Sequence, residues 1–327
     1  MELLLAAIIL IALFFDFSNG FHDCANSVST SIGTRAISPR SAIFMSAALN
    51  FLGPLIVGTA VAHTIGSGIV SPDFITPDIL LAALAGAISW NLLTWLRGLP
   101  SSSSHALIGG LIGAVVAAQG VNAINLSGLT KIFLSLLLSP IAGIFFGLLI
   151  ASLIIRFFSR RSPSKTNFLF KRLQILSSAS SSLSHGANDA QKTMGIIALA
   201  LYAFGETSQF SIPLWVIIAC AGAMALGTAC GGWRIIRTMG SRIVELKPYI
   251  GFSSEASSAI VIFTGSILGA PISTTHTVSS SIFGAGMARN VGHVHWNIVR
   301  NIFSAWFLTL PVAAVIAAAV YFLLALA

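Results

Sequence analysis

The sequence predicts an all-α membrane protein, a polytopic helical bundle made of two repeats with inverted topology. Hydrophobic residues make up 56% of the 327 residues and charged residues only 8%. The mean hydropathy is +0.92, and these values together do not describe a soluble chain. In addition, apolar runs are long enough to cross a bilayer as helices, and two unusual polar motifs each occur twice in the same order.

Several apolar runs approach the roughly 20 residues that a helix needs to cross the hydrocarbon core. The predicted spans are residues 42–62, 79–96, 132–155, 212–229 and 298–326. Residues 3–15 are also apolar, but they lack the basic start and the small-residue cleavage site of a secretory signal. We therefore expect this segment to be retained.

The basic residues indicate how the chain is divided and oriented. Despite a formal net charge of +8, they collect in loops rather than among aromatic residues on one face, which argues against nucleic-acid binding. We predict a first membrane repeat over residues 1–157, a basic linker over 158–172 and a second membrane repeat over 173–327. The positive-inside rule places the linker in the cytoplasm. The remaining charges then give the repeats opposite orientations, as in many secondary transporters.

One duplicated motif ends in an aspartate: Gly-Phe-His-Asp ends at Asp23 and Gly-Ala-Asn-Asp at Asp189. An ionised Asp in a membrane helix costs at least about 2.5 to 3.5 kcal/mol, so such residues usually face a cavity or a partner. Each has a glycine three residues earlier, where we expect a discontinuous helix to open. With Asn26 and Asn188 nearby, these groups suit Na⁺ or a proton. The alternative is that each aspartate only caps a broken helix.

The other duplicated motif reads Pro-Ser-Ser-Ser-Ser-His at 100–105 and Pro-Ile-Ser-Thr-Thr-His at 271–276. Each follows a proline turn and begins an apolar run, so we expect the tip of a re-entrant helical hairpin. Free N–H groups and the helix dipole favour an anion there. N-capping and close helix packing are the alternative, but the duplication favours a tetrahedral oxyanion site. Its predicted ligands are Ser102, Ser103, Ser104, Ser273, Thr274 and Thr275.

Histidine and cysteine residues give weaker signals. His105 and His276 either contact the anion, relay a proton or serve as buried structural groups. His22 and His185 flank the aspartates but have no third ligand at a zinc-like spacing. The three cysteines have no metal or disulfide spacing, so redox chemistry has no support and we expect structural roles for them. We expect no cofactor besides the coupling ion.

These motifs, taken together and in this order, resemble the PiT-type inorganic phosphate transporters. The resemblance implies a multi-pass protein of the bacterial cytoplasmic membrane that moves inorganic phosphate together with Na⁺ or H⁺, and that is not an enzyme. It implies that the hairpin hydroxyls, with Gln191, bind phosphate, and that Asp23 and Asp189 bind the cation. It also adds Glu255 as a cation or structural ligand. The resembling segments are Asp23 with Ala-Asn-Ser after it, and residues 185–189, 232–240, 251–255 and 271–276.

The two copies differ at a position that bears on the coupling ion. Lys192 stands where the first copy has Asn26, and sodium-coupled members of the family often have Asn in both places. Asn50 likewise stands where animal relatives have a glutamate. We hypothesise that the Lys192 ammonium fills or gates a second Na⁺ site beside Asp189, which would favour H⁺ coupling. Alternatively, Lys192 extends towards an interface or pairs with Asp189 structurally.

Two other functions use the same residues. A permease for sulfate or another oxyanion would have the same architecture. An intramembrane serine hydrolase would use Ser104 as nucleophile and His105 or His276 as base. The duplication argues against the hydrolase, which needs one asymmetric set of residues. The sequence leaves open whether the chain forms a homo-oligomer.

Overall fold

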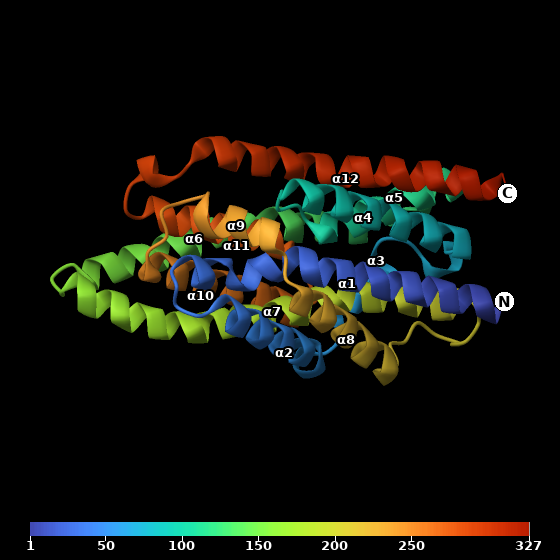
Figure 1. The fold of residues 1–327 in the computed structure, drawn as a ribbon. Coiled ribbons are helices and arrows are strands. Elements are labelled where there is room, and N and C mark those ends of the chain that lie inside the picture. Colours follow the sequence, from blue (N-terminus) through green and yellow to red (C-terminus); the bar gives the residue numbers. More distant parts are fainter. Residues whose placement is uncertain (327) are drawn as a thin grey trace.

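The computed structural model describes residues 1–326, which fold into a bundle of helices (Figure 1). Within that range the chain forms twelve α-helices and three single-turn 3₁₀ helices. The α-helices are α1 (Glu2–Gly33), α2 (Pro39–Val57), α3 (Ala60–Gly68), α4 (Pro77–Arg97), α5 (Ser103–Gln119), α6 (Leu126–Phe158), α7 (Pro163–Ala203), α8 (Leu214–Cys230), α9 (Trp233–Ser241), α10 (Pro248–Ile267), α11 (Thr274–Met287) and α12 (Trp296–Ala325). Both ends of the chain lie at the same end of the bundle (Figure 1).

Six of the described helices, α1, α2, α4, α6, α10 and α12, are long and apolar enough to cross a membrane. Helices α8 and α9 meet the same criterion together, although the chain bends by 71° between them. The exposed side chains of α6 and α12 are largely apolar, including Phe145 and Phe307. Such a surface is expected where helices face lipid. The predicted all-α membrane fold is confirmed.

Glycine turns interrupt one predicted span and end another. The apolar run 42–62 is not one helix, because α2 ends at Val57 and α3 begins at Ala60. Gly58, with φ +92°, turns the chain between them. The run 212–229 forms α8, and Gly231 with φ +72° follows it at the bend before α9. Mean hydropathy does not register such turns, because one glycine barely changes it.

The predicted discontinuous helices are wrong for the described residues. Helix α1 continues through Asp23, and α7 continues through Asp189. The glycines before the aspartates serve close packing instead. A Cβ atom at Gly20 would overlap the carbonyl oxygen of Met224 in α8, and one at Gly186 would overlap that of Asn50 in α2. Small residues allow membrane helices to approach this closely.

The Gly20→Ala variant is therefore expected to destabilise the protein, because the new methyl group would push α8 away from α1. Overpacking of this kind costs about 1 to 3 kcal/mol. Thermal unfolding in detergent would measure the loss. Gly222→Ala in α8 is the matched control, since no atom lies within 4 Å of a Cβ atom built there. Equal unfolding temperatures for the two variants would contradict the packing role of Gly20.

The predicted basic linker over 158–172 is largely helical. Helix α6 extends to Phe158 and α7 begins at Pro163, so only residues 159–162 connect them irregularly. Proline at the first position of α7 is favourable, because it has no N–H to leave unpaired. The repeat boundaries themselves stay predictions, and residue 327, the last of the predicted second repeat, lies outside the described residues.

Both predicted hairpins form, and their tips meet. Helices α4 and α5 make the first hairpin, and α10 and α11 the second. Helix α5 extends towards the end of the bundle that holds the termini, whereas α11 extends towards the other end (Figure 1). Ser102 and Ser273 cap α5 and α11 by accepting from the N–H groups of His105 and His276. The Ser273 hydroxyl donates to that of Ser102 at 2.8 Å, so the two helix N-termini face each other.

Candidate functional site

The two hairpin tips meet beside the two aspartates, in the interior of the bundle. Each predicted site residue has at most 3% of its surface exposed. Asp23 accepts hydrogen bonds from Thr275 of the second hairpin at 3.2 Å and from Ser103 of the first at 3.4 Å. His22 Nδ1 lies 2.7 Å from Asp23 Oδ1, the oxygen that also accepts from Thr275. One carboxylate on α1 therefore joins both hairpins.

Asp189 occupies the corresponding place on α7, but its carboxylate also forms an ion pair with Lys192. Thr274 donates to Asp189 Oδ2 at 2.9 Å, and the Lys192 ammonium donates to Oδ1. The same ammonium donates to Ser104 Oγ at 2.5 Å and to the Ile272 carbonyl at 2.9 Å. Lys192 is thus surrounded by oxygen atoms, as a bound metal cation would be. It does not extend towards an interface, because only 2% of its surface is exposed.

The two asparagines differ in what they leave free. Asn26 donates to Thr275 at 3.1 Å and to Thr274 at 3.4 Å, while its side-chain oxygen has no hydrogen-bond partner in the described part of the chain. Asn188 uses both ends of its amide: it donates to Ser266 and accepts from the Ile272 N–H. The free oxygen of Asn26 makes the Asp23 side the better candidate for an exchangeable cation.

The hairpin tips present a set of donors that could hold an anion. The N–H groups of Ser103, Ser104, Thr274 and Thr275 lie in the first turns of α5 and α11, where an α-helix offers them no internal acceptor. Their hydroxyls currently donate to Asp23, Asp189 and the Ile272 carbonyl. The positive ends of two helix dipoles therefore converge on one place.

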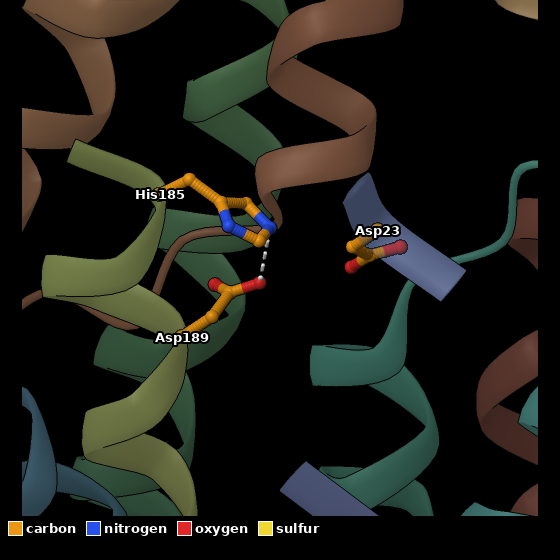
Figure 2. A group of neighbouring side chains, drawn as sticks. All are labelled: Asp23, His185 and Asp189. Atoms are coloured by element: carbon orange, nitrogen blue, oxygen red, sulfur yellow. Dashed lines mark ion pairs between the residues drawn. The ribbon is translucent and has the colours of Figure 1, made fainter. Parts of the chain in front are cut away.

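His185 joins the two aspartates, which its sequence spacing did not indicate. Figure 2 shows His185 and Asp189 on α7 and Asp23 on α1, with one ligand atom of each within 4.8 Å of the other two. His185 Nε2 lies 3.3 Å from Asp189 Oδ2, and its Nδ1 lies 3.2 Å from Asn50 Oδ1. Local spacing in the sequence does not indicate this group, because Asp23 lies on α1 while His185 and Asp189 lie on α7, far along the chain.

The hairpin histidines lie next to each other. The rings of His105 and His276 have centroids 4.4 Å apart, and His276 stacks on Trp306 of α12 at 3.9 Å. His105 Nδ1 lies 2.8 Å from the capping hydroxyl of Ser102. This packing matches the structural alternative for both residues.

Two predicted ligands have different surroundings from the rest. Gln191 accepts from the N–H groups of Val61 and Ala62 in the first turn of α3, at 2.8 and 3.3 Å, so it caps that helix. Glu255 on α10 accepts from hydroxyl groups of α1 and α7 and from an amide of α7, and its donors are Thr30, Ser31, Ser177 and Gln174. Thr30 lies two helical turns beyond Asp23, so Glu255 marks a separate polar site.

An open pocket of about 350 Å³ lies beside the turn of the first hairpin. Its lining includes four arginines, Arg97, Arg234, Arg237 and Arg242. Arg97 is exposed and lines this pocket with the arginines of α9 rather than with the tip hydroxyls. The pocket is therefore distinct from the buried cluster of aspartates and hydroxyls.

The sequence is similar to those of known phosphate transporters. A probable low-affinity inorganic phosphate transporter of Rhizobium meliloti is 48% identical over 320 residues, covering 98% of this chain and 96% of that protein. One of the same description from Bacillus subtilis is 46% identical and covers 99% of both chains.

Solved structures and family models point the same way. A structure described as "The sodium-dependent phosphate transporter" matches with a TM-score of 0.89 and 27% identity, covering 100% of both chains. The model of the phosphate transporter family matches residues 19–166 and 158–317, which together span most of the sequence. With its aspartates and hairpin tips at the centre of this shared fold, the chain belongs to the phosphate transporter family.

Proposed function

We propose that this phosphate transporter takes up inorganic phosphate across the bacterial cytoplasmic membrane by symport with a cation. The observation that carries the proposal is that two opposed helix N-termini meet against two buried carboxylates. The donors of the tips suit an anion, and the carboxylates suit a cation. Because the hairpin-tip donors contact the carboxylates, the site can bind the anion and the cation together. Either ion alone would leave a buried charge without a partner, so it would bind weakly.

Phosphate would bind between the tips through Ser103, Ser104, Thr274 and Thr275, with the capping residues Ser102 and Ser273 holding the helix ends in place. Near neutral pH, phosphate keeps a proton that sulfate lacks. Asp23 and Asp189 already accept from the tip hydroxyls, so an acceptor for that proton is within the site. This supports phosphate over sulfate. Gln191 is left out of the proposed ligands, because its side chain caps α3.

The tip hydroxyls provide a physical link between the two ions. Thr275 and Ser103 now donate their hydrogen atoms to Asp23. A cation bound at Asp23, whether a proton or Na⁺, would neutralise the carboxylate and make it a weaker acceptor for the two hydroxyls. The hydroxyl hydrogen atoms could then turn to phosphate. Cation binding would thus release the donors that the anion needs.

We further propose that the coupling cation is a proton rather than Na⁺, because Lys192 occupies the second cation position. Its ammonium contacts Asp189, Ser104 and the Ile272 carbonyl, which is an all-oxygen environment. A tethered positive charge there would neutralise Asp189 permanently. The first copy, with Asp23 and Asn26, remains as the exchangeable site.

Transport would proceed by alternating access between two inverted repeats that move around this site, with the basic linker in the cytoplasm. Two features support this proposal: the hairpins extend towards opposite ends of the bundle (Figure 1), and the central residues are buried. Glu255, among hydroxyls of α1 and α7, would serve as a further cation station on one side of the centre.

Phosphate uptake into proteoliposomes tests the proposal. With the purified chain, an inward pH gradient is expected to drive accumulation of labelled phosphate without Na⁺. Unlabelled arsenate should compete, because it has the same shape and keeps a proton, whereas sulfate should compete weakly. Uptake that requires Na⁺ and ignores the pH gradient would contradict proton coupling. Equal competition by sulfate would contradict the phosphate preference.

The hydrolase alternative is not supported, and family membership confirms that the chain is not an enzyme. Ser104 donates to the Ile272 carbonyl and accepts from Lys192. The nearest hydroxyl partner of His105 is that of Ser102 instead. The parts of a nucleophile and base are thus present in the sequence, but the fold uses them for other contacts.

A further inference from the structure

A polar stripe follows one face of α1 on both sides of the central site. Its members are Asp16, Asn19, Asp23, Asn26 and Thr30, and each has at most 2% of its surface exposed. Their spacing alternates between three and four residues, which places them on one side of an α-helix. Asp16 lies seven residues before Asp23, or about 10 Å along the helix axis. Nothing in the transport scheme above uses Asp16.

Asp16 is buried without the partners that a charged carboxylate needs. Its relative exposure is 0%, and neither carboxylate oxygen has a hydrogen-bond donor in the described part of the chain. The two aspartates of the central site, in contrast, each accept from a tip hydroxyl. A buried, ionised and unpaired carboxylate is strongly unfavourable in a membrane protein, so Asp16 must hold a cation or a proton.

The groups around Asp16 are acceptors that also lack partners. The Thr193 hydroxyl of α7 lies beside the Asp16 carboxyl group, and Asn19 follows one helical turn along α1. The side-chain oxygens of both residues have no hydrogen-bond partner among residues 1–326. A protonated carboxyl group would supply the hydrogen atom that the Asn19 oxygen lacks, and the Thr193 hydroxyl can either accept from Asp16 or donate to it.

The titratable groups near Asp16 lie on α7 and α8. They are Asp189 and Lys192 of α7 and the Cys220 thiol of α8. The Lys192 ammonium is held by Asp189, Ser104 and the Ile272 carbonyl, so it forms no ion pair with Asp16. The Asp189 carboxylate and the Lys192 ammonium form an ion pair and act on Asp16 in opposite directions, so they largely offset each other. The burial of Asp16 therefore decides, and it favours an Asp16 that carries a proton.

We propose that Asp16, with Asn19 and Thr193, is a proton-binding station that hands the coupling proton along α1 to or from the central site. The inference rests on the proposed proton-coupled symport. When Asp23 is aligned with Asp189, Asp16 is aligned with Ser182 in α7. Serine does not bind a proton in this way, so the proposed station belongs to the first repeat alone. Glu255 contacts Thr30, at the opposite end of the stripe. One acidic residue thus lies on each side of the central pair.

The test uses the purified full chain in proteoliposomes with the Asp16→Asn variant. Each coupled proton makes a gradient of one pH unit drive about a tenfold accumulation of phosphate. Asp16→Asn should therefore lose this accumulation and the phosphate-linked proton flux recorded by an internal pH dye. Exchange of labelled for unlabelled phosphate at equal pH should persist, because exchange needs no net proton movement. Asp16→Glu should restore the proton flux, and Asp78→Asn, an exposed acid, is the matched control.

The outcomes separate this inference from the proposed function. Normal phosphate-linked proton flux in Asp16→Asn would overturn the proposed proton station. If Asp16→Asn and Asp16→Glu both lose phosphate exchange as well as proton flux, Asp16 has a structural role, and the proposal is overturned too. Loss of a sodium dependence with intact proton flux would assign the site to Na⁺ and also overturn it. If Asp16→Asn does not fold, Asp16→Ser, which copies Ser182, replaces it with the same expected loss. A wild-type chain that exchanges no phosphate contradicts the proposed function instead.

Discussion

Replacing Asp23 by Asn is expected to reduce cation-driven phosphate uptake roughly 10- to 100-fold. The reason is that a hydrogen bond to a charged group contributes about 1.5 to 3 kcal/mol, and each 1.4 kcal/mol changes an equilibrium constant tenfold. The variant keeps the size of the side chain and one acceptor oxygen, which can serve either Thr275 or Ser103, since these hydroxyls now donate to different oxygens of Asp23. It loses the negative charge that binds the coupling cation, and one acceptor oxygen becomes an NH₂ donor. Uptake driven by a pH gradient in proteoliposomes measures the loss.

Folding must be shown to survive this change. Size-exclusion profiles and thermal unfolding of Asp23→Asn should match those of the wild type, and Asp78→Asn on the exposed start of α4 should transport normally. If Asp23→Asn transports phosphate with unchanged dependence on the cation, Asp23 does not bind that cation. In that case Asp189 or Glu255 would have to take the role.

The sequence predicted the two halves of the site because the duplication made them conspicuous. Each aspartate motif and each hydroxyl motif stood out as polar residues in apolar surroundings, and the fold brings all four together. Helix continuity was not predictable in the same way. A glycine before Asp23 is compatible with an open helix or with close packing, and only the position of α8 against Gly20 decides between them.

The sequence also did not predict which side chains contact each other between elements that are far apart in the chain. Gln191 is adjacent to Lys192 in the chain, yet its side chain caps α3 while Lys192 contacts the second hairpin. Helical geometry points consecutive residues in directions about a quarter turn apart, so neighbours in sequence serve different neighbours in space. The role of Asp16 could not be predicted from duplication, because the corresponding residue in the second half is Ser182.

Replacing Lys192 by Asn is expected to change the coupling ion. The substitution restores the residue that the first copy has at Asn26 and removes the ammonium from its oxygen ligands on Asp189, Ser104 and Ile272. The space left beside Asp189 would then be lined by oxygen atoms and carry a negative charge, which suits Na⁺. Phosphate uptake by Lys192→Asn should therefore require Na⁺, while the wild type should not.

The matched control is Lys192→Met, which removes the charge but offers no ligand oxygen. Losing one partner of a buried ion pair typically costs about 3 to 5 kcal/mol, so this variant should unfold at a lower temperature and transport poorly with either cation. Added Na⁺ should raise the unfolding temperature of Lys192→Asn, because a ligand stabilises the state that binds it. If Na⁺ neither stabilises Lys192→Asn nor drives its uptake, the ammonium is a structural partner of Asp189 and does not stand in for a cation.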